Sequence, residues 1–385
     1  AVRRIVCSVN ETAATRRTLL SAGTILFLLL GVLQTIYGPA LTAFSHRFDM
    51  GVEAVSLLVS AHFFGAFGAT LLTTVILKRL HYRGTLLSAA ALIAAGALII
   101  ASSPVWILTV LGVAVTGFGV GLINSGMTVY LSAIFAPNHG PVLNLLNSLF
   151  GIGAVAAPLI VSALGDEISL PFYVGALVAF AGLFILMRLP TTDRPVQHAN
   201  PWAIGAAWPL LAGFGVMYFF YVATEAGVTT WEISHLTPIV GAQQAALYTS
   251  LYWGAITIGR FIGTGLSLKY SSKAILLGAT VGTTASLGLA HIPSFAPYAY
   301  VLVGLFIAPI FANGLAWLAQ LRPKQADQLI PLAMAAASLG PVATTPLIAA
   351  VVANAGVTVI PTAILLCSAF MLGGVLWLWG KRPVS

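Results

Sequence analysis

Long apolar stretches recur along the whole chain and are separated by short polar segments. A membrane-spanning helix needs about 20 mostly apolar residues to cross roughly 30 Å of hydrocarbon. Twelve stretches of this kind follow one another along the sequence. We place the spans at 18–44, 54–77, 84–103, 105–135, 141–164, 170–189, 203–231, 242–267, 274–292, 296–320, 329–354 and 358–379.

These stretches are too long, and alternate too weakly between polar and apolar residues, to be strands of a membrane barrel. A backbone in hydrocarbon must satisfy its own hydrogen bonds, which a helix does within one segment. We therefore predict an all-α integral membrane protein. The composition agrees, because only 7% of the residues are charged, whereas a soluble domain carries about a quarter.

The net charge of +8 would raise the question of nucleic-acid binding in a soluble protein. Here the basic residues precede the first span or follow an even-numbered span, and across the membrane from them the loops carry only Arg47. They are Arg3, Arg4, Arg16, Arg17, Lys78, Arg79, Arg83, Arg188, Arg194, Lys269, Lys273, Arg322, Lys324, Lys381 and Arg382. By the positive-inside rule both termini are cytoplasmic. We expect the protein to lie in a plasma membrane, the inner membrane of a bacterium, where lipid surrounds it, and we expect no binding of nucleic acid.

The sequence contains an internal repeat. LKRLHYRGTLL at 77–87 recurs as LKYSSKAILL at 268–277, and Pro-Leu-Ile at 158–160 recurs at 346–348. Asn124 matches Asn313 at nearly the same displacement. The agreement predicts two pseudo-symmetric six-helix bundles, 1–190 and 203–385, joined by a cytoplasmic linker at 191–202. Parallel halves of this kind are typical of transporters whose substrate site lies between them.

Polar side chains inside the spans identify candidate substrate ligands. Spans three, six, nine and twelve hold no ionisable residue deep inside, with only Arg188 and His291 at the ends of spans six and nine, and are expected to face lipid. The other spans supply amides, aromatics and one deep acid. The candidates are Gln34, Tyr37, His62, Asn124, Asn144, Asn147, Glu225, Tyr252, Trp253, Asn313 and Trp317. Amides bond to sugar hydroxyls, and aromatic rings can cover the apolar face of a sugar. The alternative for each amide is a hydrogen bond that only holds helices together.

Two ionisable residues are candidates for proton coupling. Glu225 is the only acid that we place deep in a span, where a charge is costly, and the His62 imidazole can titrate near neutrality. Each can instead hydrogen-bond to a neighbouring helix. Arg260, near the cytoplasmic end of span eight, is assigned a conformational role because a cation there can pair with a helix C-terminus.

Four segments resemble one known family. NLLNSLFGIGAVAAPLI from residue 144, YFFYVATEAGVTTW at 218–231, YWGAITIGRFIG at 252–263 and GLFIAPIFANG at 304–314 are similar to the fucose-permease-like sugar branch of the major facilitator superfamily. The resemblance implies a twelve-helix transporter with alternating access. It also implies a conformational role for the loop between spans two and three. That loop keeps Lys78, Arg79 and Arg83 but lacks the usual acid.

We therefore expect a secondary active or facilitative transporter of a small neutral solute, a hexose or related sugar. A proton symport through Glu225 is a further hypothesis, although the N-terminal spans lack the carboxylates that the resemblance would imply. The alternatives are a drug or amphiphile exporter of the same fold and a membrane receptor that binds solute without moving it. No catalytic cluster or metal-ligand spacing is visible, so we expect a protein that is not an enzyme and uses no cofactor or metal. We also expect a monomer.

Overall fold

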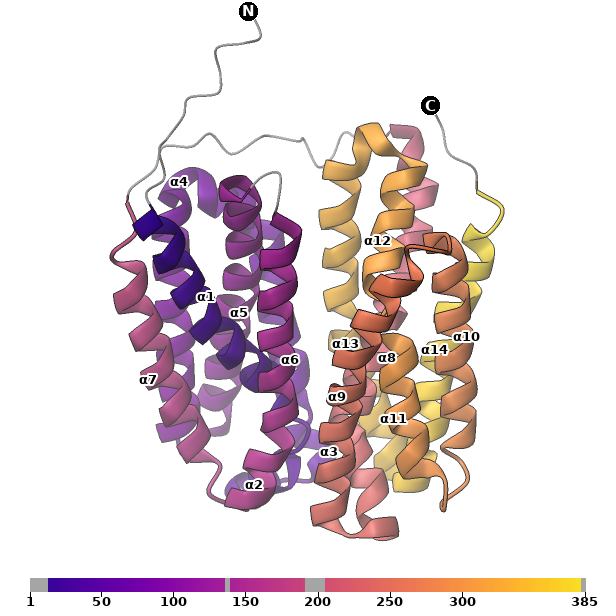
Figure 1. Cartoon of the computed structure of the whole chain (residues 1–385). Coiled ribbons are helices and arrows are strands. Elements are labelled where there is room, and N and C mark those ends of the chain that lie inside the picture. The colour runs from indigo at the N-terminus through magenta and orange to yellow at the C-terminus, as the bar shows by residue number, and fades with distance from the viewer. Residues whose placement is uncertain (1–12, 136–138, 191–204, 382–385) are drawn as a thin grey trace, which may run out of the picture.

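Two groups of helices lie side by side in the computed structural model (Figure 1), which describes residues 13–135, 139–190 and 205–381. The first group ends at residue 190 and the second begins at residue 205. The predicted linker, 191–202, lies outside the described residues. Within the described part, the regular secondary structure is entirely helical, as predicted.

The first group contains seven helical segments. They are α1 (Ala13–Thr35), α2 (Leu41–Phe48), α3 (Val52–Val55), α4 (Leu57–Ser102), α5 (Trp106–Ile134), α6 (His139–Leu164) and α7 (Ser169–Leu186). The second group also contains seven, α8 (Trp208–Val240), α9 (Ala242–Leu266), α10 (Ser272–Leu289), α11 (Ala296–Ile307), α12 (Ile310–Leu321), α13 (Ala326–Ala355) and α14 (Ile360–Leu378). Single turns of 3₁₀ helix cover Gly205–Ala207, Pro323–Gln325 and Val357–Val359.

These segments fit the predicted spans once two kinds of irregularity are recognised. The first and tenth spans are each broken, between α1 and α2 and between α11 and α12. Pro39 and Pro309 lie in these breaks, where proline removes a backbone donor. The second and third spans form one continuous segment, α4, but the chain turns at His81, whose φ of 54° and ψ of −179° are not helical.

Nine helical stretches in the described residues are long and apolar enough to cross a membrane. One of them, Val52–Ser102, covers two of the predicted spans. Two further predicted spans, α9 and α10, fall outside this set, and α9 carries two glutamines and Arg260. Both nevertheless pack within the second bundle, against α11. The chain is therefore a multi-pass membrane protein.

A close helix crossing occurs in the same form in each half. Gly153 of α6 lies against the backbone of α1, where an added Cβ would collide with the Leu28 carbonyl. Gly340 of α13 lies in the same way against the Phe219 carbonyl of α8. Small residues at such crossings allow two membrane helices to approach closely. The equivalent contacts hold α1 and α8 in their bundles, and these two helices carry residues of the pocket described below.

The two halves touch at the break between α1 and α2. Gly38 lies against the backbone of Thr229 and Thr230 in α8, so closely that a side chain at residue 38 would collide with it. The Ser60 hydroxyl of α4 also donates to the Pro341 carbonyl of α13 at 3.4 Å. The start of α1 and the end of α14 lie at one end of the bundles and α2 at the other (Figure 1). The Gly38 contact is therefore on the side away from the termini.

Candidate substrate site

A small pocket lies between the two halves, next to the Gly38 contact. It combines residues from α1, the break after it and α4 with residues from α8 and α9. Its lining is Gln34, Thr35, Gly38, Val59, Phe63, Glu225, Ala226, Thr229, Thr230 and Trp253. Three of the predicted ligands, Gln34, Glu225 and Trp253, are therefore brought together from both halves.

Glu225 is the charged group of this pocket. The Tyr221 hydroxyl, one helical turn earlier on α8, donates to its carboxylate at 2.6 Å. The Tyr252 hydroxyl of α9 donates to the Glu225 backbone carbonyl at 3.3 Å. Arg260, two turns further along α9, acts electrostatically on Glu225, but the two form no direct ion pair within the described residues. The carboxylate is thus held by one tyrosine and balanced at longer range by one cation.

Trp253 and Gln34 contribute the other polar groups of the pocket. The Trp253 indole packs edge-on against Phe150 of the opposite half, with ring centroids 6.1 Å apart. Its indole nitrogen is buried and makes no hydrogen bond within the described part of the chain. Gln34 stands in the last turn of α1, just before the break. The pocket therefore holds an acceptor, an amide and an unpaired donor.

Tyr37 and His62 form a buried pair in the N-terminal half. Their ring centroids are 5.2 Å apart, and His62 is only 1% exposed. The Tyr37 hydroxyl and both imidazole nitrogens lack a hydrogen-bond partner among the described residues. Phe63, which lines the pocket, packs edge-on against His62. The pair does not line the pocket itself.

The remaining amides and aromatics are not among the pocket residues. The Asn147 side chain donates to the Leu143 carbonyl one turn back at 3.0 Å, and Asn124 is exposed. The Asn313 amide donates to the Pro309 carbonyl at 2.9 Å, at the break between α11 and α12. Trp317 packs edge-on against Phe214. The side chain of Asn144 lies outside the described residues.

The predicted conformational residues are found where α4 turns. Lys78 and Arg79 are exposed there. Arg83, just after the turn, donates to the Met187 carbonyl at 2.8 Å, which links this turn to the end of α7. The contact lies within the first half, so a role in moving one half against the other stays a prediction.

Sequence reasoning missed two residues beside Glu225 on α8. The expectation that Glu225 is the only acid deep in a span is wrong, because α8 continues nine residues beyond the predicted end at 231 and Glu232 is fully buried. Tyr221, the hydroxyl donor to Glu225, is also absent from the predicted ligands. Helical spacing is the signal that could have found both residues, because the positions four before and seven after Glu225 share its helix face.

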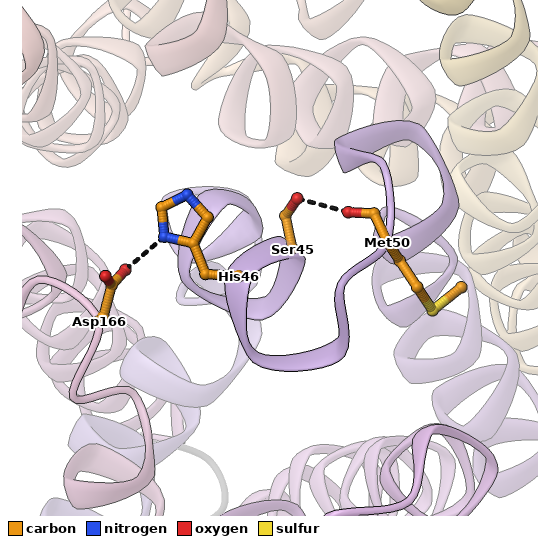
Figure 2. A network of polar contacts seen from close by, with 4 residues as sticks. All are labelled: Ser45, His46, Met50 and Asp166. Atoms are coloured by element: carbon orange, nitrogen blue, oxygen red, sulfur yellow. Dashed lines mark hydrogen bonds and ion pairs between the residues drawn. The ribbon is translucent and has the colours of Figure 1, made fainter.

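A separate polar cluster lies away from the termini, at the end of the first bundle (Figure 2). His46 of α2 contacts the Asp166 carboxylate, which follows α6, with 3.0 Å between Nδ1 and Oδ1. Ser45 donates to the Met50 carbonyl at 2.5 Å. Arg47 donates to the carbonyl of Ser103 at 2.6 Å. This cluster ties α2 to the neighbouring helix ends and is distinct from the pocket.

Two helical bundles that meet at a polar pocket are the arrangement found in transporters built from two parallel six-helix halves. Residues 23–307 match the family model described as Major Facilitator Superfamily, and the chain belongs to that superfamily. The predicted superfamily, its transport activity and the non-enzymatic nature of the protein are thereby confirmed.

Known sugar transporters are among the similar proteins. The glucose/mannose transporter GlcP of Bacillus subtilis is 22% identical over 337 residues, covering 82% of this chain and 83% of the relative. A glucose/galactose transporter of Brucella abortus is 24% identical over 330 residues, covering 76% of this chain and 77% of the relative.

Two solved structures show the same fold. The xylose transporter XylE from E. coli matches with a TM-score of 0.75 at 15% identity, over 96% of this chain and 98% of that chain. FucP in its outward conformation matches with a TM-score of 0.67 at 18% identity, over 93% of this chain and 98% of that chain.

Proposed function

We propose that this protein transports a hexose, with D-glucose as the first substrate to test, by alternating access at the pocket between its halves. The observation that carries the proposal is the meeting of Gln34, Glu225 and Trp253 from opposite halves in one pocket. The names of the two bacterial relatives, which are transporters of glucose with mannose or galactose, support the same class of substrate.

The chemistry of the pocket suits a neutral polyhydroxylated solute. A carboxylate accepts hydrogen bonds from hydroxyls, and the Gln34 amide can both donate and accept. The unpaired indole nitrogen of Trp253 is a donor, and its ring offers an apolar surface for a sugar ring face. No Lys or Arg lines the pocket, so an anionic solute would find no charge partner in its wall.

The contacts between the halves support a transport cycle. In the state described here Gly38 presses against α8 on one side of the pocket. A solute can enter or leave past Gly38 only if α1 and α8 separate there. We assign the termini to the cytoplasmic side on the basis of the basic loops. The state with Gly38 packed on α8 is then closed toward the outside.

Uptake of radiolabelled D-glucose into proteoliposomes, with a panel of competitors, tests the proposal. We expect unlabelled hexoses to compete and amphiphilic drugs not to compete. Competition by the drugs alone would favour an exporter of the same fold. Saturable binding of glucose to the purified protein without entry into the vesicles would instead identify a receptor.

A further inference from the structure

Glu232 is a buried acid that the proposed sugar site does not use. It lies two helical turns beyond Glu225 on α8 and is 0% exposed. Neither carboxyl oxygen has a hydrogen-bond partner within the described residues. Thr249 of α9 lies close enough to Glu232 to act on its carboxyl group, but the single hydroxyl proton of Thr249 is donated to the Ala245 carbonyl at 3.2 Å. Burying an ionised group without partners is energetically costly, so an acid at this position calls for a functional explanation.

The surroundings of Glu232 contain weak acids and bases but no cation. Tyr252 of α9 and Tyr300 of α11 both interact electrostatically with Glu232. Figure 1 shows α8, α9 and α11 next to one another. The other helices of the second bundle that pack on α8 are α12, α13 and α14, and the only Asp, Glu, Lys, Arg or His among them is Asp327, in the first turn of α13. From the first bundle, the break that holds Gly38 also lies against α8, and it carries Tyr37, whose ring pairs with His62. Glu232 therefore lacks the counter-charge that Arg260 gives to Glu225.

Three titratable side chains lie between Glu232 and the surface, linked to it and to one another by one direct contact and by electrostatic interactions. The Tyr300 hydroxyl lies 3.0 Å from Nδ1 of His235, one turn beyond Glu232 on α8. His235 is 7% exposed and interacts electrostatically with His291. His291 is exposed in the loop after α10, where its Nε2 lies 2.9 Å from the Thr362 hydroxyl. This loop is at the end of the bundle away from the termini.

We propose that Glu232 is a proton-binding site, and that Tyr300, His235 and His291 connect it to the face opposite the termini. In this step a hydronium ion at that face loses a proton, which becomes bonded to a Glu232 carboxylate oxygen, and a water molecule remains. The reverse step, after the halves have moved, returns the proton to water on the other side. The proposal rests on the proposed sugar transport and divides its tasks between Glu225, which binds sugar, and Glu232, which binds the proton.

A proton fits this site better than a metal cation does. Metal cations that favour oxygen need several oxygen ligands, and no group of three or more His, Cys, Asp or Glu gathers anywhere in the described part of the chain. Hydroxyl and imidazole groups, in contrast, can both donate and accept a hydrogen bond, which is what passing a proton requires. Protonation also removes the cost of a buried charge without any partner.

Infrared spectroscopy of the full-length protein in lipid tests the site without using a sugar. We expect the carbonyl-stretch signal of a protonated carboxyl at neutral pH in the wild type and its loss in Glu232→Gln. Glu167→Gln, the same substitution at an exposed acid, should keep the signal. An identical signal in the wild type and Glu232→Gln would overturn the proposal.

Transport measurements separate this proposal from the proposed function. We expect Glu232→Gln to exchange glucose across the membrane at a wild-type rate. Under a pH gradient, the ratio of internal to external glucose should fall to one in this variant. Tyr300→Phe, which removes only a hydroxyl, should slow that accumulation and leave exchange unchanged. Wild-type accumulation in Glu232→Gln, or wild-type accumulation that follows a sodium gradient alone, would contradict the proton site. Absence of glucose exchange in the wild type would contradict the sugar proposal, and the infrared signal would still decide the role of Glu232.

Discussion

Tyr221 and Glu225 form the shortest polar contact of the pocket wall, at 2.6 Å. The hydroxyl holds the carboxylate toward the space between the halves, where a sugar hydroxyl can donate to the oxygen that Tyr221 leaves free. Glu225 differs in this respect from Glu232, whose oxygens are both unpartnered in the described structure. The proposed sugar role of Glu225 and the proposed proton role of Glu232 rest on this difference between their neighbours.

Tyr221→Phe removes this donor and leaves the ring in place. A hydrogen bond to a charged group contributes about 1.5–3 kcal/mol, and 1.4 kcal/mol corresponds to about a tenfold change in affinity. We expect the KM for glucose uptake to rise by about tenfold or more. Tyr270→Phe, at an exposed tyrosine, is the matched control. An unchanged KM in Tyr221→Phe would show that the hydrogen bond does not serve substrate binding.

At the scale of the helices, the crossings at Gly153 and Gly340 hold α1 and α8 in their bundles. These helices carry Gln34 and Glu225, so a shift at either crossing moves a wall of the pocket. Interiors this closely packed respond to a single added methyl group.

Gly153→Ala should therefore lower the melting temperature of the purified protein. The added Cβ would meet the Leu28 carbonyl, a backbone atom that cannot turn aside, and overpacking of this kind costs about 1–3 kcal/mol. Gly278→Ala in α10 is the matched control, because nothing lies within 4 Å of its added Cβ. We expect the control to be neutral or stabilising, since alanine favours helix over glycine by about 1 kcal/mol. Equal melting temperatures for the two variants would contradict the account of the crossing.

Most of the helices could be predicted from the sequence, because a span in hydrocarbon must be both long and apolar. The end of α8 could not be placed by that rule. The helix stays buried past residue 231 although its sequence becomes polar, and this hid Glu232. Both broken spans contain a proline that marks the break, yet the depth at which a break opens depends on the packing of the neighbouring helix.

The members of the pocket were only partly predictable for a similar reason. Polarity inside a span selected Gln34, Glu225 and Trp253, but it selected Asn313 and Trp317 equally, and these pack within their own half. Side-chain type does not say which face of a helix meets the opposite bundle. That information comes from the contact of Gly38 with α8 and from the pairing of α6 with α9.

For the molecule as a whole, the proposed transport cycle takes the Gly38 contact as the point that closes the pocket on the side away from the termini. A side chain at residue 38 would collide with the backbone of Thr229 and Thr230. An added side chain at residue 38 would therefore destabilise the closed arrangement relative to the arrangement in which the halves have separated at this contact. An equilibrium between two states responds to any such difference in free energy.

Gly38→Ala should thus shift the population toward the state that is open on the side away from the termini. The measurement is the labelling rate of Thr230→Cys by a membrane-impermeant maleimide, with Cys7 and Cys367 replaced by serine. We expect faster labelling in Gly38→Ala than in the same background with Gly38. Gly373→Ala, whose added Cβ meets nothing within 4 Å, should leave the rate unchanged. A rate that does not respond to Gly38→Ala would show that this contact does not close the pocket.

Counterflow of radiolabelled D-glucose in proteoliposomes tests the central claim most directly, because transient accumulation against preloaded unlabelled glucose requires a carrier and no external energy. We predict a clear overshoot for the wild type and for Glu167→Gln, and a strongly reduced overshoot for Glu225→Gln. An overshoot of full size in Glu225→Gln would remove this acid from the sugar site. No overshoot with glucose, mannose or galactose in the wild type would contradict hexose transport by this protein.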